Sequence, residues 1–129
     1  MLRFLTITLF VFPLTATADP ALECSLDSGS QIEVGDCVAR TDEHVEKALG
    51  FALDQAMLAA KDLDQVTGRQ VAVPALNQGQ AAWEAYRAAH CTYAGATYGG
   101  GSGAGIATRS CWVTVGRTRV EQLMLFADQ

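Results

Sequence analysis

The stretch Trp83–Cys111, WEAYRAAHCTYAGATYGGGSGAGIATRSC, decides how this chain folds. Its first part is rich in alanine, which favours helix, and ends at the first of two cysteines. A glycine-rich segment from Gly99 to Gly105 follows, where a helix is expected to stop. The second cysteine then opens another helical pattern. We predict two helices joined by an ordered glycine loop, with the rest of the chain packed against them.

The chain contains four cysteines, and their pairing sets the framework of the fold. They are Cys24, Cys37, Cys91 and Cys111. An even number in a short exported chain indicates disulfides, and four cysteines allow three pairings. We favour Cys24–Cys37 and Cys91–Cys111, because each pair brackets an irregular stretch and a long helical segment separates the pairs. Each bridge is worth about 3 kcal/mol on the chain-entropy model. Zinc sites need short C-x-x-C spacings, which are absent, so no metal is expected.

The segment before the decisive stretch predicts one long helix. Thr41 provides a capping hydroxyl, and acidic residues follow it at the positive end of the helix dipole. The helix should run from about Thr41 to Val66 and stop near Gly68. Residues 19–40 are expected to form a loop or short turns. Apolar residues at steps of three and four form the buried stripe: Val45, Leu49, Ala52, Ala56, Ala59 and Leu63.

Two further helices complete the predicted all-α fold. Pro74 suits the first turn of the second helix, which the glycine loop ends. A shorter third helix spans Cys111–Ala127. The fold class is therefore two long helices and a shorter third, stapled by two disulfides. The second stripe contains Leu76, Gln80, Trp83, Arg87, His90 or Cys91, and Ala94, and the third contains Trp112, Val115, Arg119, Leu123 and Phe126.

The N-terminus has the features of a secretory signal peptide. Arg3 precedes an uncharged, largely apolar run from Phe4 to Leu14, and Ala16 and Ala18 form an A-x-A cleavage pattern. The run is too short to span a bilayer. We expect residues 1–18 to be removed and 19–129 to form one domain that is periplasmic or secreted, without a membrane anchor. That domain carries eight basic and fourteen acidic side chains, so a nucleic-acid partner is not expected.

Arg87 and Arg119 lie within apolar stripes rather than on polar faces. A buried guanidinium needs acceptors, because an unpaired buried charge is very costly. The expected acceptors for these arginines are carbonyls between Gly99 and Thr108, or an acid such as Asp42 or Glu46. Trp83 lies one turn before Arg87 and is expected to pack against it. Replacement of Arg87 by alanine should then lower the melting temperature by several degrees.

The loop GGGSGAG does not predict catalysis. It lacks the Gly-Lys-Ser/Thr ending of a phosphate-binding loop. Ser102 would need a base and an orienting acid to act as a nucleophile, and the two histidines offer no clear partner. The loop glycines are instead expected to adopt positive φ and to pack under Trp83 and Trp112. We expect a protein that is not an enzyme and that uses no cofactor.

The motif residues resemble the lysozyme inhibitor LprI-like family of bacterial exported proteins. Three blocks carry the resemblance: Gln80-x-x-Trp83-x-x-Tyr86-Arg87-x-x-x-Cys91, then Gly100-Gly101-Ser102, then Cys111-x-x-x-Val115-x-x-x-Arg119-x-x-x-Leu123. The resemblance covers Cys24 to Leu123. It implies a structural network of Trp83, Tyr86, Arg87 and Arg119. The chain departs from the family pattern at Ala88, where an acid is usual, at Leu49-Gly50, where Leu-Asn is usual, and at Gly116, where threonine is usual.

The resemblance also implies a function, inhibition of lysozyme by protein–protein contact. The acidic charge suits a basic enzyme. An inhibitor would need an exposed loop, and the candidate partner-binding residues are Gly99, Gly100, Gly101 and Ser102. The alternative is a structural or envelope-stress protein that binds another exported partner and does not inhibit lysozyme. The expected partner is therefore a lysozyme-like enzyme or another exported protein.

Overall fold

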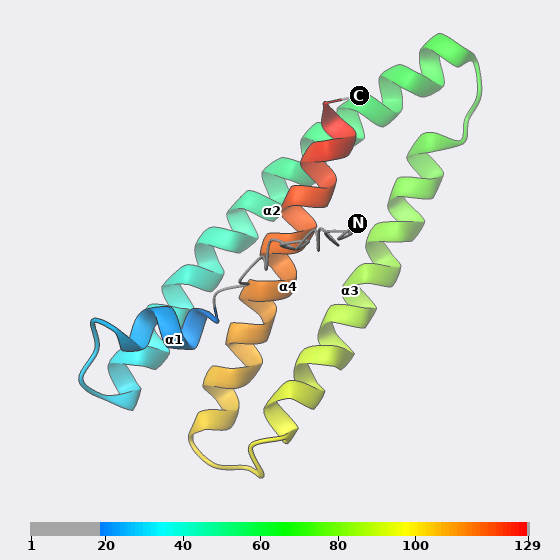
Figure 1. Ribbon diagram of the computed structural model, residues 1–129. Helices are drawn as coiled ribbons and strands as arrows, with labels where there is room; N and C mark the ends of the chain where they lie inside the picture. Colours follow the sequence, from blue (N-terminus) through cyan, green and yellow to red (C-terminus); the bar gives the residue numbers. More distant parts are fainter. Residues whose placement is uncertain (1–18, 129) are drawn as a thin grey trace, which may run out of the picture.

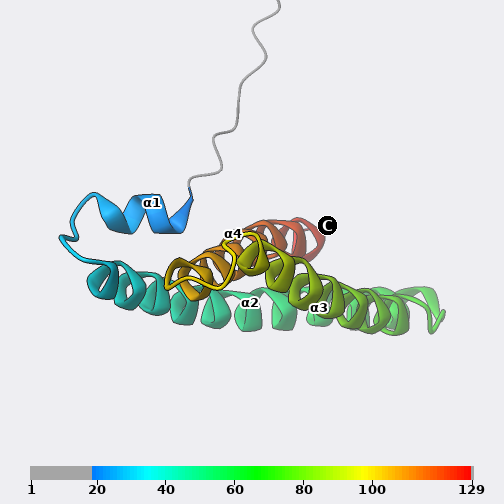
Figure 2. The same cartoon turned by 90° about the horizontal axis from the view of Figure 1, so that it is seen from below.

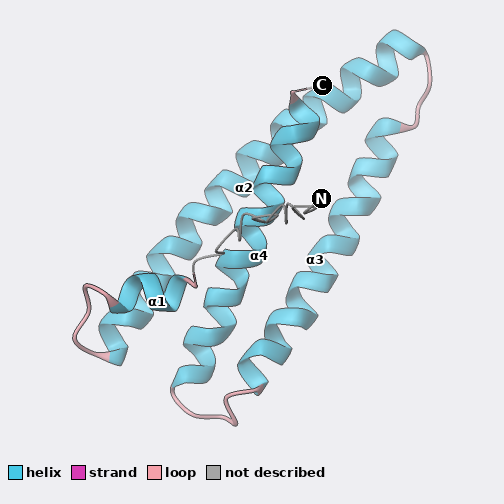
Figure 3. Ribbon diagram, in the orientation of Figure 1, coloured by secondary structure: helices cyan, strands magenta, loops and turns pink. Residues whose placement is uncertain are grey.

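The computed structural model describes residues 19–128 as four helices joined by short connections, with no strand in that range (Figure 3). The helices are α1 (Pro20–Ser25), α2 (Gln31–Thr67), α3 (Ala72–Ala96) and α4 (Gly103–Ala127). The expected signal peptide, residues 1–18, lies outside the described residues. No helix among the described residues is long and apolar enough to cross a membrane.

The three long helices form one elongated body, with α1 packed against one end. The helices α2 and α4 run in the same direction and α3 runs in the opposite one (Figure 1). The contacts of α4 with α2 and with α3 are more extensive than those between α2 and α3. Figure 2 shows α1 and α4 on the same side of α2. The fold is all-α, as predicted.

The core lies where α2 and α4 cross, and it uses most of the predicted stripe of α2. Its buried members are Val45, Leu49, Ala52, Ala56, Val113 and Leu123. The stripe predicted for α4 missed Val113, which is 0% exposed, and its last member, Phe126, is 52% exposed. The α2 stripe is buried as far as Ala56, whereas Leu63 is mostly exposed.

The start of α2 was predicted ten residues too late. Residues 19–40 were expected to be irregular, but α1 occupies six of them and α2 begins at Gln31. Ser30 caps α2 by accepting a hydrogen bond from the Glu33 backbone N–H at 3.3 Å. The Glu33 carboxylate accepts in turn from the Ser30 hydroxyl and from the Gly29 N–H, both at 3.0 Å. This is a variant of the capping box, in which Glu33 accepts from the Gly29 N–H rather than from the Ser30 N–H. Thr41 lies inside the helix, where its hydroxyl donates to the Cys37 carbonyl.

The start of α4 was also predicted too late. It begins at Gly103 rather than Cys111, so α3 and α4 are equally long, at 25 residues each, and α4 is not a shorter helix. The glycine turn is correspondingly short. Pro74 lies in the first turn of α3. Gly68 caps the C-terminus of α2 with a φ of 68°. Both positions agree with the predictions.

Both predicted disulfides are present. Cys24–Cys37 ties α1 to α2 with a Cα–Cα distance of 5.8 Å, and Cys91–Cys111 ties α3 to α4 with 5.4 Å. A bidentate ion pair between Glu23 and Arg117, at 2.8 and 3.0 Å, adds a link from α1 to α4. Its hydrogen bonds hold the pKa of Glu23 below the ordinary value.

The side chain of Asp64 joins the end of α2 to the start of α3. Its carboxylate accepts hydrogen bonds from the N–H groups of Val71, Ala72 and Val73, at 3.0, 2.8 and 3.1 Å. These are donors that the first turn of a helix leaves unpaired. Val71, at the N-cap position, provides no side-chain cap of its own. The hydrogen bonds, led by that from Ala72, lower the pKa of Asp64.

Replacement of Asp64 by alanine should lower the melting temperature by roughly 5–10 °C at neutral pH, the range expected for loss of a helix cap in a small domain. The folded-state pKa lies below the ordinary 3.8, so the stabilisation is fully present above the unfolded value and is lost as pH falls through the folded one. Thermal unfolding from pH 7 to pH 2 should therefore show the wild type and the variant converging at the acidic end. A constant difference at all pH values would contradict the cap.

Candidate functional site

The guanidinium of Arg87 forms the polar centre of the molecule. The residue is 5% exposed. Its Nη2 donates to the Glu46 carboxylate on α2 and to the Trp112 carbonyl on α4, the latter at 2.9 Å. Asp42 lies 3.8 Å from the same nitrogen. One side chain of α3 therefore connects all three long helices.

Two tryptophans and two arginines alternate along the interface between α3 and α4. The Arg87 guanidinium lies 4.6 Å from the Trp112 ring centroid and 5.2 Å from that of Trp83. Arg119 lies 5.7 Å from the Trp83 ring. These distances are typical of cation–π contacts, which are stronger when the cation is desolvated. We call Trp112, Arg87, Trp83 and Arg119 the cation–π ladder.

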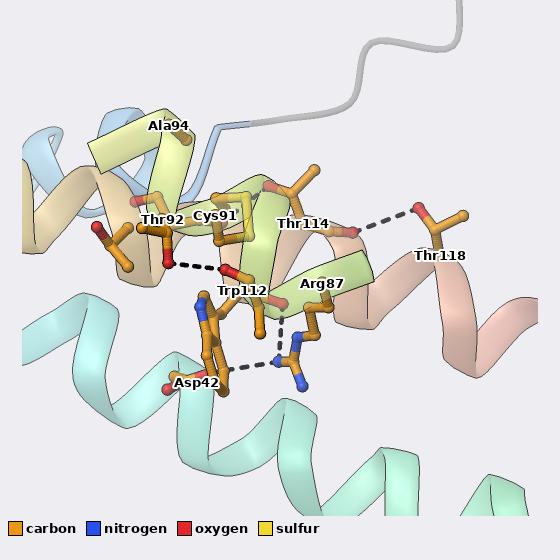
Figure 4. The surroundings of a disulfide bond; sticks show 12 residues. Asp42, Arg87, Cys91, Thr92, Ala94, Trp112, Thr114 and Thr118 are labelled. Atoms are coloured by element: carbon orange, nitrogen blue, oxygen red, sulfur yellow. Dashed lines mark hydrogen bonds and ion pairs between the residues drawn. A yellow bond between two sulfur atoms is a disulfide. The ribbon is translucent and has the colours of Figure 1, made fainter. Parts of the chain in front are cut away.

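Residue spacing explains how the ladder forms. Trp83 and Arg87 are four residues apart on α3, and Trp112 and Arg119 are seven apart on α4, so each pair shares one helix face. The Cys91–Cys111 disulfide lies one turn from Arg87 and next to Trp112 (Figure 4). It therefore holds the two helices together beside the ladder.

The predicted acceptors of Arg87 are only partly correct. Glu46 and Asp42 are near it, as expected, but the loop carbonyls do not contact it. Gly99 is twelve residues further along the chain, about 18 Å for helical geometry. Instead, the carbonyl of Trp112 accepts the hydrogen bond. Burial, followed by the charge of Glu46, raises the pKa of Asp42.

Arg119 has amide partners rather than acidic ones. Its Nε donates to the Gln80 side chain at 3.1 Å, and its Nη1 lies 3.4 Å from that of Gln122. Among the described residues, no carboxylate lies within 4.0 Å of it, unlike Arg87, Arg109 and Arg117. Burial lowers the pKa of Arg119. This guanidinium is therefore partly buried without an ionic partner in the described chain.

Tyr86 lies outside the ladder, although the family resemblance placed it in the network. It is 56% exposed and stacks on His90, with ring centroids 5.2 Å apart. Tyr93, seven residues further on, is also exposed, as is Tyr98 after the end of α3. Residues 86, 90 and 93 share one helix face, so an aromatic stripe of Tyr86, His90 and Tyr93 leads along α3 toward Tyr98. This stripe was not predicted, although Tyr86 and Tyr93 are seven residues apart in the sequence.

The glycine turn projects from the end of the molecule and does not pack under the tryptophans. Gly99 and Gly100 have φ of 65° and 88°, as predicted, but a Cβ on either would meet nothing within 4 Å. Ser102 is exposed at the N-cap position of α4, and its side chain makes no capping hydrogen bond. The four candidate loop residues, Gly99 to Ser102, are thus exposed, and their backbone is uncovered.

The close approach of helices instead depends on two glycines outside the turn. A Cβ at Gly95 would overlap the Thr108 hydroxyl, and its distance to the Ala104 carbonyl would be 3.2 Å. Gly95 therefore lets α3 and α4 approach each other just above the turn. Gly116 has the corresponding role between α4 and α2. Together with Cys91–Cys111, the contact at Gly95 holds both ends of the turn.

These features define a class of protein: a small all-α domain with two disulfides, a buried arginine network and an exposed glycine turn. No group of three or more metal-ligating side chains occurs in the described part of the chain. The profile of the family described as Lysozyme inhibitor LprI matches residues 23–123, and the chain belongs to this family. No curated protein and no solved structure matches the chain.

Proposed function

We propose that this protein is an exported inhibitor that binds a lysozyme-type enzyme through its glycine turn. The observation that carries the proposal is the family match over residues 23–123, and the exposed turn supports it. The two disulfides suit an oxidising compartment. Within the proposal, residues 1–18 are the signal peptide, residues 19–129 form the mature domain, and the protein is periplasmic or secreted.

A turn with little side-chain bulk would suit insertion into an enzyme cleft. Three consecutive glycines give it a backbone without side-chain bulk, and Ser102 adds a hydroxyl with no capping role. The disulfide and the Gly95 contact hold both flanking helices, so the two ends of the turn are fixed before binding. Such pre-organisation raises affinity.

The aromatic stripe would extend the contact surface beyond the turn. Tyrosine is enriched at protein interfaces because its ring is apolar and its hydroxyl can form hydrogen bonds. Tyr93 is 70% exposed and Tyr98 is 60% exposed. Neither burial nor the ladder explains these side chains. The acidic charge of residues 19–129 would also attract a basic enzyme over long range.

Replacement of Gly101 by glutamate should weaken inhibition by at least roughly tenfold, because a glycosidase cleft contains two carboxylates and like charges in an interface cost several kcal/mol. The measurement is lysis of bacterial cell walls by several lysozymes, with purified oxidised protein at moderate salt. A Cβ at Gly101 would lie 3.9 Å from the Tyr98 carbonyl, so the variant should fold normally.

Two controls isolate the turn. Gly101→Ser places a small neutral side chain at the same position and should keep most of the inhibition. Gly50→Glu adds the same charge to α2, where a Cβ would meet nothing within 4 Å, and should inhibit like the wild type. Equal loss in both glutamate variants would assign the effect to net charge rather than to the turn. Absence of inhibition of every lysozyme by folded wild-type protein would refute the proposal and favour another exported partner.

A further inference from the structure

An apolar groove of about 870 Å³ lies at the end of the molecule opposite the glycine turn. The α2–α3 hairpin extends past the end of α4 there (Figure 1). Six alanines line the groove, and we call them its alanine floor; we call the larger apolar side chains of the lining its edges. The alanines are Ala56, Ala59, Ala60, Ala72, Ala75 and Ala127, and the edges include Leu63, Val66 and Phe126.

The edges of the groove are unusually exposed for large apolar side chains. Leu63, Val66 and Phe126 are 54%, 78% and 52% exposed. Leu58, Val71 and Leu125 at the same end are exposed as well. Exposed large apolar side chains along a groove are typical of a binding site. The groove follows α2 from Ala56 to Val66, about 15 Å at the rise of an α-helix.

Arg119 is the positively charged residue at one end of the groove. It lines the groove together with Gly79 and Leu76, and it is partly buried with no carboxylate within 4.0 Å among the described residues. Its two hydrogen-bond partners are neutral amides. The other charged residue of the lining is Asp62. Because Asp62 is exposed, it can keep its carboxylate in water.

We infer that this groove binds a linear aliphatic anion, with its acidic head group on the Arg119 guanidinium and its alkyl chain along the alanine floor between α2, α3 and α4. A carboxylate would provide the ionic partner that Arg119 lacks, through a charge-assisted hydrogen bond. The alkyl chain would cover the exposed apolar edges. The site is independent of the glycine turn and of lysozyme inhibition.

The experiment titrates the exported, oxidised protein with decanoate below its micelle-forming concentration, by calorimetry and by tryptophan fluorescence. Trp83, next to Arg119, should report binding. Saturable 1:1 binding is expected. Octanoate should bind more weakly, by up to about fourfold for each methylene lost, the factor that corresponds to ~0.8 kcal/mol. Decanol and decyltrimethylammonium, which lack the anion, should bind at least tenfold more weakly.

Two variants test the two ends of the site, and a third is the matched control outside it. Arg119→Gln should weaken decanoate binding by about tenfold to a hundredfold, the range for a hydrogen bond to a charged group. Ala75→Phe should fill the groove and abolish binding. Ala85→Phe makes the same change at an exposed position of α3 that is not part of the groove lining, and it should bind like the wild type.

Several results would overturn the inference. The site would be contradicted if decanoate showed no saturable binding, if decanol bound as tightly as decanoate, or if Ala75→Phe and Ala85→Phe had equal effects on binding. It would also be contradicted by a concentration-dependent dimer in sedimentation velocity that Ala75→Phe disrupts and that decanoate leaves unchanged. That last result would assign the groove to a second copy of the chain.

Discussion

Replacement of Arg87 by alanine should lower the free energy of unfolding by about 3 kcal/mol, because removal of one member of a buried ion pair leaves its partners uncompensated. Arg87 is 5% exposed and contacts Glu46, the Trp112 carbonyl and two indole rings. The Glu46 side chain is 48% exposed, which keeps the expected loss near the lower end of the range for buried pairs. For a domain of this size the melting temperature should fall by roughly 10–15 °C.

The pH dependence separates the charge of Arg87 from its volume. Burial and Glu46 already raise the pKa of Asp42, and Arg87 opposes this. Without Arg87 the folded-state pKa of Asp42 would rise further. A raised folded pKa means stability that is present at low pH and lost as pH rises through that value. The destabilisation should therefore be larger at pH 7 than at pH 4.

Arg87→Met is the matched control, because it keeps most of the aliphatic volume and removes the charge. It should show the same pH dependence as Arg87→Ala with a smaller loss at pH 4. Denaturant unfolding at both pH values measures the effect. A loss below about 1 kcal/mol at pH 7, the size typical of an exposed ion pair, would mean that the arginine network does not hold the three helices together.

The sequence predicted what depends on local pattern. The stripe from Val45 to Ala56, the end of α2 at Gly68 and both disulfides follow from periodicity, glycine conformation and cysteine spacing. The start of α2 was missed because Pro20, Gly29, Gly35 and the scattered polar residues around them were interpreted as irregular structure. The capping box Ser30-x-x-Glu33 was the available signal.

The rest depends on contacts between helices, which no local pattern specifies. Gly103 and Gly105 are helical in α4. The next residue, Ile106, packs against Gly35, which lies near the start of α2. The pairing of Arg119 with Gln80 and of Arg87 with the Trp112 carbonyl depends on how α3 and α4 align. The stripes indicated that Arg87 and Arg119 would be buried or half-buried, and acids of α2 were correctly expected near Arg87. The Trp112 carbonyl and the Gln80 amide were not expected as partners.

Gly116 stands where the family pattern has threonine, and its position in the structure explains what the missing side chain does. In the structure it is buried where α4 crosses α2. A Cβ at this position would lie 2.6 Å from Val45 Cγ1, 3.2 Å from Arg87 Nη2 and 3.4 Å from Leu49 Cδ1. The absence of a side chain therefore sets the distance between the two helices beside the arginine network.

Replacement of Gly116 by leucine should destabilise the protein by about 3 kcal/mol or more, at the upper end of the cost of overpacking. The core would have to open at Val45, and the hydrogen bonds of Arg87 would be displaced. Gly116→Ala should also destabilise, by about 1 kcal/mol, because the clash exceeds the gain of up to ~1 kcal/mol in helix propensity. Denaturant unfolding monitored by circular dichroism measures both variants.

Gly50→Ala is the matched control, since Gly50 is exposed in α2 and a Cβ there would meet nothing within 4 Å. It should gain roughly 0.5–1 kcal/mol from helix propensity alone. Opposite signs for the two alanine variants would show that packing decides the effect at Gly116. The opposite result would be that Gly116→Ala stabilises the protein as much as Gly50→Ala. In that case the crossing of α2 and α4 would accommodate a methyl group without a clash, and the close contact there would not define the fold.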